Sequence, residues 1–168
     1  MMAQAHPKLA LRPFLPADTA LLREIFRASI EQLTADDYSE AQQQAWSSAA
    51  DDEAAFGKDL GSQLTLVATL AGSPVGFASL ASGNRIEMLY VHPAAAGQGV
   101  GAMLIDALEK LAGSRGAALL TVDASDSARS FFEKRGYVAQ QRNSVLVGGE
   151  WLANTTLHKQ LAAKREAS

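Results

Sequence analysis

The sequence predicts an α/β (α+β) domain in which helices cover both faces of a mixed sheet. Two observations support this prediction. Residues 63–91 contain three β-rich runs separated by short turns with glycine, which is typical of an antiparallel meander. Residues 85–122 then follow the order strand, glycine-rich turn, helix, strand, which is typical of a parallel crossover. A chain with both patterns combines antiparallel and parallel strand pairs in one sheet.

The length and composition are those of one globular domain. The 168 residues suffice for a single core and are too few for two ordinary domains, so we expect one domain over residues 1–168, with an ordered core at about residues 8–160. Hydrophobic residues make up 48% and charged residues 20%, which excludes a chain too polar to fold.

Charge and cysteine content exclude several classes of function. Fifteen Lys and Arg oppose eighteen Asp and Glu without a long block of either sign, so we expect no nucleic-acid partner. The absence of cysteine excludes disulfides and thiolate catalysis, and His6, His92 and His158 are too far apart in sequence to suggest a metal site. No apolar run has the length of a signal peptide or a membrane span, so we expect a cytoplasmic protein without a membrane partner.

The first third of the chain is predicted to be mainly helical. Residues 9–14 are predicted to form a short strand, which ends at the prolines at positions 13 and 16. Apolar residues recur at helical spacing from Asp18, a suitable N-cap, to Leu33, which predicts an amphipathic helix. A glutamine- and alanine-rich stretch that carries Trp46 predicts a second helix over residues 39–50, and residues 51–60 can form a third.

The middle of the chain contains the meander and the crossover. Strands are predicted over residues 63–70, 74–80 and 85–91. A helix is then predicted over residues 100–112, with Gly113 at its end. The apolar run 117–122, which precedes Asp123, is typical of a central strand buried on both faces.

The C-terminal part is predicted to complete the sheet. Ser125 can cap a helix over residues 126–135, and Gly136 can end it. Strands are predicted over residues 137–142, 145–147 and 150–158. This order of elements places helices on both faces of the mixed sheet.

Three glycines, Gly97, Gly99 and Gly101, lie between the strand at 85–91 and the helix at 100–112. Glycine allows a sharp turn and the close approach of a ligand, and the free N–H groups at a helix start attract an anion. The turn therefore predicts a phosphate site, although a tight turn that serves packing alone fits the same pattern. Both a P-loop and a dinucleotide fingerprint fit poorly, because Ala102 replaces the P-loop lysine and a long loop with Pro93 separates strand from turn.

Two segments resemble signatures of the GNAT (N-acetyltransferase) superfamily. The run Met88 to Pro93, followed by Gly97-Gln98-Gly99-Val100-Gly101 and the helix after it, is similar to the cofactor motif Arg/Gln-x-x-Gly-x-Gly/Ala. The run Ala128 to Tyr137 is similar to the second signature, Ala-x-x-Phe-Tyr-x-Lys-x-Gly-Phe. The resemblance implies the GNAT fold, a mostly antiparallel six- to seven-stranded sheet with a central splayed pair of parallel strands, and it points to a branch of largely uncharacterised bacterial acetyltransferases.

The resemblance also implies that acetyl-CoA is the co-substrate. In this family the strand before the turn bulges, and its backbone N–H groups bind the arm and the acyl oxygen of the cofactor. The implied cofactor-binding residues are Leu89, Tyr90, Val91, Ala96, Gly97, Gln98, Gly99, Val100, Gly101, Ala102, Ser125, Phe131 and Phe132. For Ser125 the role of an N-cap is the simpler interpretation.

Two residues depart from the family pattern. Ala96 stands where the motif has Arg or Gln, so backbone amides, with help from Gln98, must bind the pyrophosphate. Phe132 stands where a tyrosine usually acts as general acid toward the thiolate, so that role is vacant or filled elsewhere.

Glu87 is the candidate catalytic base. It lies two residues before Leu89 and therefore shares its face of the strand by the period of two. In many relatives a glutamate on this strand is the general base. Anchoring of the substrate ammonium and a purely structural carboxylate remain open as alternatives.

Tyr38, Trp46 and Asp123 are the predicted substrate-binding residues. Tyr38 and Trp46 lie in the segment that lines the acceptor site in GNATs, although core packing is the default interpretation of Trp46. Tyr38 has acidic neighbours, so we expect it to be partly exposed as a substrate contact or as a substitute catalytic acid, a role for which Tyr90 and Tyr137 also qualify. Asp123 either contacts the substrate or caps the following helix.

Taken together, the resemblance implies acetyl transfer from acetyl-CoA to a primary amine of a small molecule or peptide, by direct attack in a ternary complex and without a metal. Homodimers are common in the superfamily, so a homodimer is expected. The alternative is a non-catalytic module that binds CoA or acyl-CoA, because Ala96 and Phe132 are both losses at functional positions.

Overall fold

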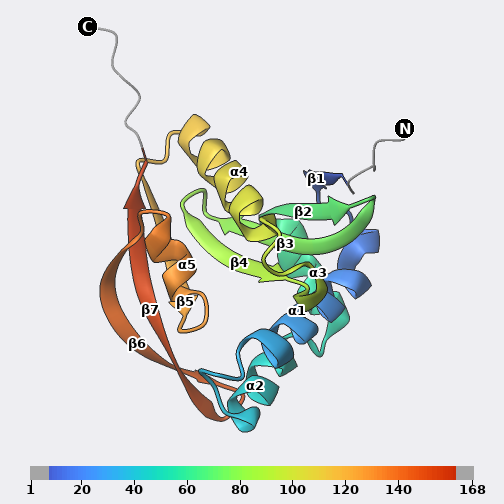
Figure 1. Cartoon of the computed structure of the whole chain (residues 1–168), viewed down its shortest axis with the longest axis vertical. Helices are drawn as coiled ribbons and strands as arrows, with labels where there is room; N and C mark the ends of the chain where they lie inside the picture. Colours follow the sequence, from blue (N-terminus) through green and yellow to red (C-terminus); the bar gives the residue numbers. More distant parts are fainter. Residues whose placement is uncertain (1–7, 162–168) are drawn as a thin grey trace, which may run out of the picture.

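The computed structural model describes residues 8–161, which build a seven-stranded sheet in the order β1-β2-β3-β4-β5-β7-β6 (Figure 1). Every neighbouring pair is antiparallel except β4 and β5, which run parallel. The strands are β1 (Leu9–Pro13), β2 (Leu64–Leu70), β3 (Ser73–Ala81), β4 (Arg85–Val91), β5 (Leu119–Ser125), β6 (Val138–Val147) and β7 (Glu150–Gln160). The α-helices are α1 (Thr19–Leu33), α2 (Glu40–Ser47), α3 (Glu53–Ser62), α4 (Val100–Ser114) and α5 (Arg129–Lys134), and the short 3-10 helices are η1 (Pro16–Asp18), η2 (Ser48–Ala50) and η3 (Pro93–Ala95).

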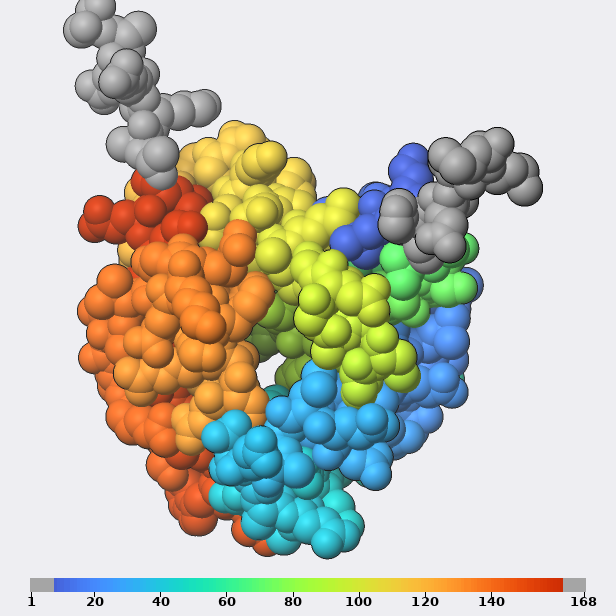
Figure 2. All heavy atoms as spheres, in the orientation of Figure 1, coloured from blue at the N-terminus to red at the C-terminus, as the bar shows by residue number. Residues whose placement is uncertain are grey.

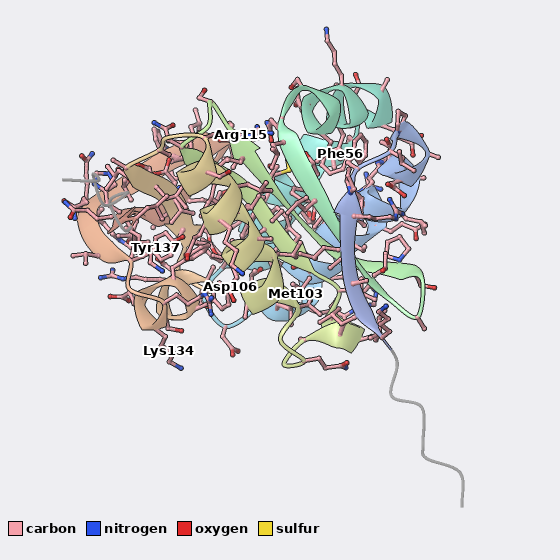
Figure 3. The ribbon with its side chains drawn as sticks, turned by 90° about the horizontal axis from the view of Figure 1, so that it is seen from above. Phe56, Met103, Asp106, Arg115, Lys134 and Tyr137 are labelled. Atoms are coloured by element: carbon pink, nitrogen blue, oxygen red, sulfur yellow. The ribbon has the colours of Figure 1, made fainter. Side chains whose placement is uncertain are left out.

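Helices cover both faces of the sheet, as predicted. On one face α4 and α5 pack on a core that includes Leu104, Leu108 and Phe132, together with strand residues such as Leu120. On the other face α1 and α3 pack on a second core. Figure 3 shows this division, with Met103 and Asp106 on α4, Tyr137 beside α5, and Phe56 on α3. In the described part of the chain no helix is long and apolar enough to cross a membrane.

The sequence pattern of α1 explains which face it buries. Leu22, Ile25, Phe26, Ser29 and Ile30 recur at spacings of three and four residues and are all buried. Because these positions form one stripe on a helix, α1 presents them together to the sheet. The α1 helix thereby covers the face of β3 and β4 that carries Phe77, Met88 and Tyr90.

The sheet opens at its centre. The parallel pairing of β4 and β5 comprises only Arg85 with Thr121 and Ile86 with Val122, and it ends there. On its other side β4 pairs with β3, where Ser79 lies opposite Met88 and Leu80 opposite Ile86, so that Glu87 is one extra residue in β4. Such a bulge bends a strand and increases its twist. Past Ile86, β4 therefore diverges from β5 and leaves a gap between the two halves of the sheet.

Two helix termini differ from the sequence predictions. The Asp18 side chain does not cap α1; it accepts a hydrogen bond from Leu15 N at 2.8 Å and pairs with Arg12 at 2.7 Å. Gly113 was predicted to end the helix over residues 100–112, but it lies inside α4. Gly116 ends the helix instead: it has a left-handed conformation (φ +92°), and Ala117 N after it donates to Ala112 O.

Two strands differ as well. The strand predicted at 117–122 corresponds to β5 at Leu119–Ser125, so Asp123 lies within the strand and not after it. The residues of β5 alternate between buried and half-buried, whereas burial on both faces was predicted. The two short strands predicted at 137–142 and 145–147 are the single strand β6, with an irregularity between Ala139 and Gln141.

Candidate active site

A cavity of about 450 Å³ lies in the gap between β4 and β5. Figure 2 shows its mouth as a hollow at the centre of the molecule, bordered by the turn before α4, by α5 and by the α1–α2 region. Residues from both faces of the sheet line it: Ile86, Leu89, Val91, Val122, Ala124 and Phe132 from the α4 face, and Ile30, Leu33, Trp46, Met88, Tyr90 and Asp123 from the α1 face. The cavity therefore passes through the sheet.

The glycine turn forms the wall of the cavity at the start of α4. Gly97 and Gly99 have φ values of +77° and +82°, which disfavour any residue with a side chain, and no heavy atom lies within 4 Å of the position of a Cβ at either residue. The first turn of α4 has no side-chain cap and no acidic residue. Its backbone N–H groups and positive dipole end are therefore available, and the turn fits an anion such as a phosphate.

The polar side chains near the turn serve the loop itself. The Gln98 side-chain amide donates to Ala94 O at 3.3 Å, and His92 Nδ1 accepts from Ala94 N at 3.0 Å. Ala96 lines the cavity and offers no polar side chain. Backbone N–H groups are therefore the groups that this wall offers to an anion.

Gly101 has a different task from Gly97 and Gly99. A Cβ at Gly101 would lie 3.4 Å from two ring atoms of Phe131. Gly101 therefore faces the Phe131 ring of α5 and not open space, and the Phe131 ring packs edge-on against Phe132 with 5.2 Å between ring centroids. Phe131 and Phe132 line the cavity on the side of α5, with Phe132 buried.

The free edge of β4 offers backbone groups to the cavity. His92 N, just after β4, donates to Val75 O next to β3 at 2.8 Å. Because N–H directions alternate along a strand, the N–H groups of Leu89 and Val91 point the other way, toward the gap left by β5. The peptide of Tyr90 points toward β3, so of the three predicted residues Leu89 and Val91 have the suitable orientation.

Glu87, Arg85 and Asp123 form a charged network at the closed end of the gap. Arg85 Nε donates to Glu87 Oε2 at 3.0 Å, and Arg85 Nη2 donates to Asp123 Oδ2 at 2.5 Å. Asp123 Oδ1 also accepts from the Thr156 hydroxyl at 2.6 Å. Burial acts to raise the pKa of the Asp123 carboxyl, but the hydrogen bonds from Thr156 and Arg85 and the charge of Arg85 outweigh it and hold the pKa below its ordinary value.

The bulge changes the face on which Glu87 lies. Simple alternation predicted that Glu87 shares the face of Leu89, but Leu89 packs on the α4 side whereas Met88 and Tyr90 pack on the α1 side. The extra residue shifts the alternation by one. Paired with Arg85, Glu87 lies on the α1 side together with Asp123. Arg85 was absent from the predicted site, although its position two residues before Glu87 in a strand is a signal that could have identified it.

Trp46 and Tyr90 form an aromatic wall on the α1 side. Trp46 Nε1 donates to the Tyr90 hydroxyl at 3.2 Å, and the two rings pack edge to face with 6.3 Å between centroids. Burial raises the pKa of Tyr90 to about 12. Both residues line the cavity, and both also pack against the second core.

Tyr38 is buried, which contradicts the predicted partial exposure. Its hydroxyl donates to Ala153 O on β7 at 2.6 Å and accepts from Asp126 N after β5 at 2.9 Å. This geometry gives Tyr38 structural contacts, because its one hydroxyl proton is already donated and Tyr38 is not part of the cavity lining, and its role as a catalytic acid or substrate contact stays a prediction. Tyr38 instead connects the α1–α2 loop to the C-terminal half of the sheet.

The remaining predicted residues have structural contacts. Ser125 Oγ accepts from Ala128 N at 3.1 Å and so caps the turn that leads into α5, while Ser125 also lines the cavity. The Asp123 carboxylate makes no such cap. The Tyr137 hydroxyl donates to Glu109 at 2.8 Å on the outer side of α4, and Tyr137 lies outside the cavity lining. Among residues 8–161 no cluster of His, Asp and Glu has the arrangement of a metal site.

Comparison with known sequences identifies related acetyltransferases. The family model described as "Acetyltransferase (GNAT) domain" matches residues 34–153. The chain is also 32% identical over 146 residues to the uncharacterized N-acetyltransferase YafP of Escherichia coli (strain K12), over 87% of this chain and 92% of that protein.

Comparison with solved structures gives the same fold. The GCN5-related N-acetyltransferase from Rhodopseudomonas palustris is 66% identical, with a TM-score of 0.90 over 96% of this chain and 99% of that one. Two more distant structures share the fold: the PaiA N-acetyltransferase of Thermoplasma acidophilum in complex with coenzyme A (18% identity, TM-score 0.75, coverage 91% and 99%) and yncA of Salmonella typhimurium with its cofactor acetyl-CoA (22% identity, TM-score 0.63, coverage 96% and 99%). These matches confirm the predicted fold.

Proposed function

Because the chain belongs to the GNAT family of N-acetyltransferases, we propose that it transfers an acetyl group from acetyl-CoA to a primary amine inside the cavity between β4 and β5. The observation that carries the proposal is that this one cavity joins the glycine turn on the α4 face to Glu87 on the α1 face. A cofactor that enters along α4 and an amine that enters along α1 meet in the gap.

The α4 side of the cavity suits CoA. Its pyrophosphate would bind the N–H groups at the start of α4, where the open space at Gly97 and Gly99 permits close approach of the phosphates. The N–H groups of Leu89 and Val91 would hold the pantetheine arm and the acyl oxygen along the free edge of β4. Two fold neighbours of this chain, PaiA and yncA, were solved with coenzyme A and acetyl-CoA respectively.

The α1 side suits the amine and its proton. When bound, acetyl-CoA supplies the activated thioester, and the amine attacks it directly. Glu87 would accept the proton that the ammonium must lose, while Arg85 holds the carboxylate in place. Holding both reactants in one cavity lowers the entropic cost of their encounter.

We propose that Tyr90 is the general acid toward the CoA thiolate, the role that a tyrosine at the position of Phe132 usually has. Of the three tyrosines in the chain, it lines the cavity, whereas Tyr38 and Tyr137 donate their hydroxyl protons to Ala153 and Glu109. The Tyr90 hydroxyl accepts from Trp46, which leaves its own proton free to donate. Because its pKa is raised to about 12, Tyr90 keeps that proton at neutral pH.

The proposal is tested by replacing the base. We expect Glu87→Gln to lower kcat by about a hundredfold or more, the usual contribution of a general base, and to leave the Kd of CoA unchanged. The rate of the variant should then follow the ionisation of the amine itself as pH rises. The control is Glu133→Gln, which also removes a carboxylate from an arginine pair but lies outside the cavity. Unchanged kcat in Glu87→Gln would exclude Glu87 as the base.

A non-catalytic module that binds CoA is the second candidate function. It is favoured by Ala96 and by Phe132, which remove two side-chain functions from the site. Thiol release from acetyl-CoA with a broad panel of primary amines separates the two functions. Tight binding of CoA without thiol release on any amine would establish the module and refute acetyl transfer.

A further inference from the structure

From the charges and surfaces of the α1 side of the cavity, we infer that the acceptor is a primary monoamine with an uncharged, apolar body, an alkylamine or arylalkylamine. The inference rests on the proposed function and narrows it to a substrate class. Three features of the described residues support it: the charge balance at the closed end of the gap, the absence of cationic side chains from the cavity lining, and the apolar wall beyond the carboxylates.

The charge balance allows one ammonium group. Glu87 and Asp123 carry two negative charges, and Arg85 between them carries one positive charge, so the network has a net charge of −1. A single substrate ammonium beside Glu87 neutralises this charge. The three side chains are 30–42% exposed, so the preference is one of charge: after one cation has neutralised the network, a second cation meets no remaining net negative charge.

The lining disfavours a substrate carboxylate. Among the described residues that line the cavity there is no Lys, Arg or His, and the two charged ones, Glu87 and Asp123, are both acidic. The Arg85 guanidinium is already shared between these two carboxylates. An amino acid or a peptide with a nearby carboxylate would therefore bring a negative charge beside two others without a cation to pair it.

The wall beyond the carboxylates is mostly apolar, and its polar groups on the α1 side are the hydroxyls of Ser29 and Thr34. Ile30 and Leu33 of α1, Met88 of β4, and the rings of Trp46 and Tyr90 surround the path from the α1 side. Apolar contact with these side chains stabilises an apolar substrate body by removing its surface from water. The same surfaces give a second ammonium of a diamine or polyamine nothing to pair with.

Three amines of equal chain length test the inference. Hexylamine, hexamethylenediamine and ε-aminocaproate each have six carbons and an amine at one end, and their sixth carbon is a methyl, a methylene that carries an ammonium, or a carboxylate. We expect kcat/KM for hexylamine to exceed that for each of the other two by about tenfold or more, since tenfold corresponds to a modest difference in transition-state binding. The measurement is thiol release at saturating acetyl-CoA.

Charged variants of Leu33 provide a second, independent readout. Leu33 lines the cavity and is 42% exposed, so a charged side chain can be placed there without burial. Leu33→Asp should raise the ratio of kcat/KM for the diamine to that for hexylamine by about tenfold, and Leu33→Lys should do the same for ε-aminocaproate. The matched control is Leu21→Asp on the same helix, 49% exposed and outside the lining, which should leave all three ratios unchanged.

The outcomes separate this inference from the proposed function. If the diamine or ε-aminocaproate is used as well as hexylamine, or better, the substrate class is wrong while acetyl transfer stands. If hexylamine and an arylalkylamine such as phenethylamine are not acetylated but an amine with a second charged group is, the substrate class is again wrong. If no amine of any kind releases thiol, the proposed function itself fails. A shift of the ratios in Leu21→Asp equal to that in Leu33→Asp would likewise overturn the assignment of this wall to the substrate.

Discussion

Gly99 and Gly72 have nearly the same backbone conformation, with φ values of +82° and +85°, and at both residues the space around a Cβ is open. They differ in place, because Gly99 precedes α4 in the cavity wall whereas Gly72 lies in the turn between β2 and β3. At either position a residue with a side chain would have to keep this left-handed conformation, which costs roughly 1–2 kcal/mol. Comparing substitutions at Gly99 and Gly72 therefore separates the effect of backbone strain on stability from the effect of a side chain on ligand binding.

Alanine at these two glycines should have the same effect on stability and different effects on CoA binding. We expect Gly99→Ala and Gly72→Ala to lower the free energy of unfolding by similar amounts in urea titrations. The Kd of CoA, measured by calorimetry, should rise about tenfold or more in Gly99→Ala alone, because the methyl group occupies the space that the phosphates need. Equal CoA affinity in the two variants would remove the phosphate site from this turn.

At the scale of elements, the α1–α2 loop connects the N-terminal helices to the C-terminal half of the sheet by long-range contacts. Tyr38 contacts Asp126 after β5 and Ala153 on β7, and the Ser127 hydroxyl donates to Asp37 at 2.7 Å. These contacts join the N-terminal helices to the half of the sheet beyond the gap, which consists of β5, β7 and β6. The spacing between the helices on one side and α5 on the other is thereby held by this loop.

Tyr38→Phe tests whether Tyr38 is structural. The change leaves Ala153 O and Asp126 N without their buried partner, so we expect the free energy of unfolding to fall by about 1–3 kcal/mol. The kcat with saturating amine should stay within a few-fold of that of the unaltered protein. A large loss of kcat at unchanged stability would restore the catalytic role that the sequence predicted for Tyr38.

The elements that local pattern determines were predictable from the sequence. The meander, the glycine turn and the start of α4 at Val100 follow from β-rich runs, turn residues and helical periodicity. The bulge at Glu87 was not predictable, because it depends on how β4 fits between two neighbours and leaves the local pattern of the strand unchanged. The same holds for the Tyr38 contact with Ala153, which spans 115 positions in the sequence.

At the scale of the whole molecule, two arginine–carboxylate pairs join neighbouring elements of the fold. Arg12 and Asp18 tie β1 to the entry of α1, and Arg85 and Asp123 tie β4 to β5 across the last residues that pair these strands. The pKa of Asp18 is lowered, first by its hydrogen bond with Arg12 and in spite of burial, and the pKa of Asp123 is lowered as well. Stability should therefore depend on pH in the acid range.

We expect the protein to lose stability as pH falls below about 4, and Asp18→Asn to weaken this dependence. The folded state holds the pKa of Asp18 below its ordinary value of 3.8, so the unfolded chain binds the proton more readily. The stabilising effect is thus complete above the unfolded pKa and disappears as pH falls through the folded one. Urea unfolding between neutral and acid pH, followed by the fluorescence of Trp46 and Trp151, should show a difference between the unaltered protein and Asp18→Asn that is largest at neutral pH and shrinks in acid. A difference that stays constant over the whole range would show that Asp18 contributes packing and not charge.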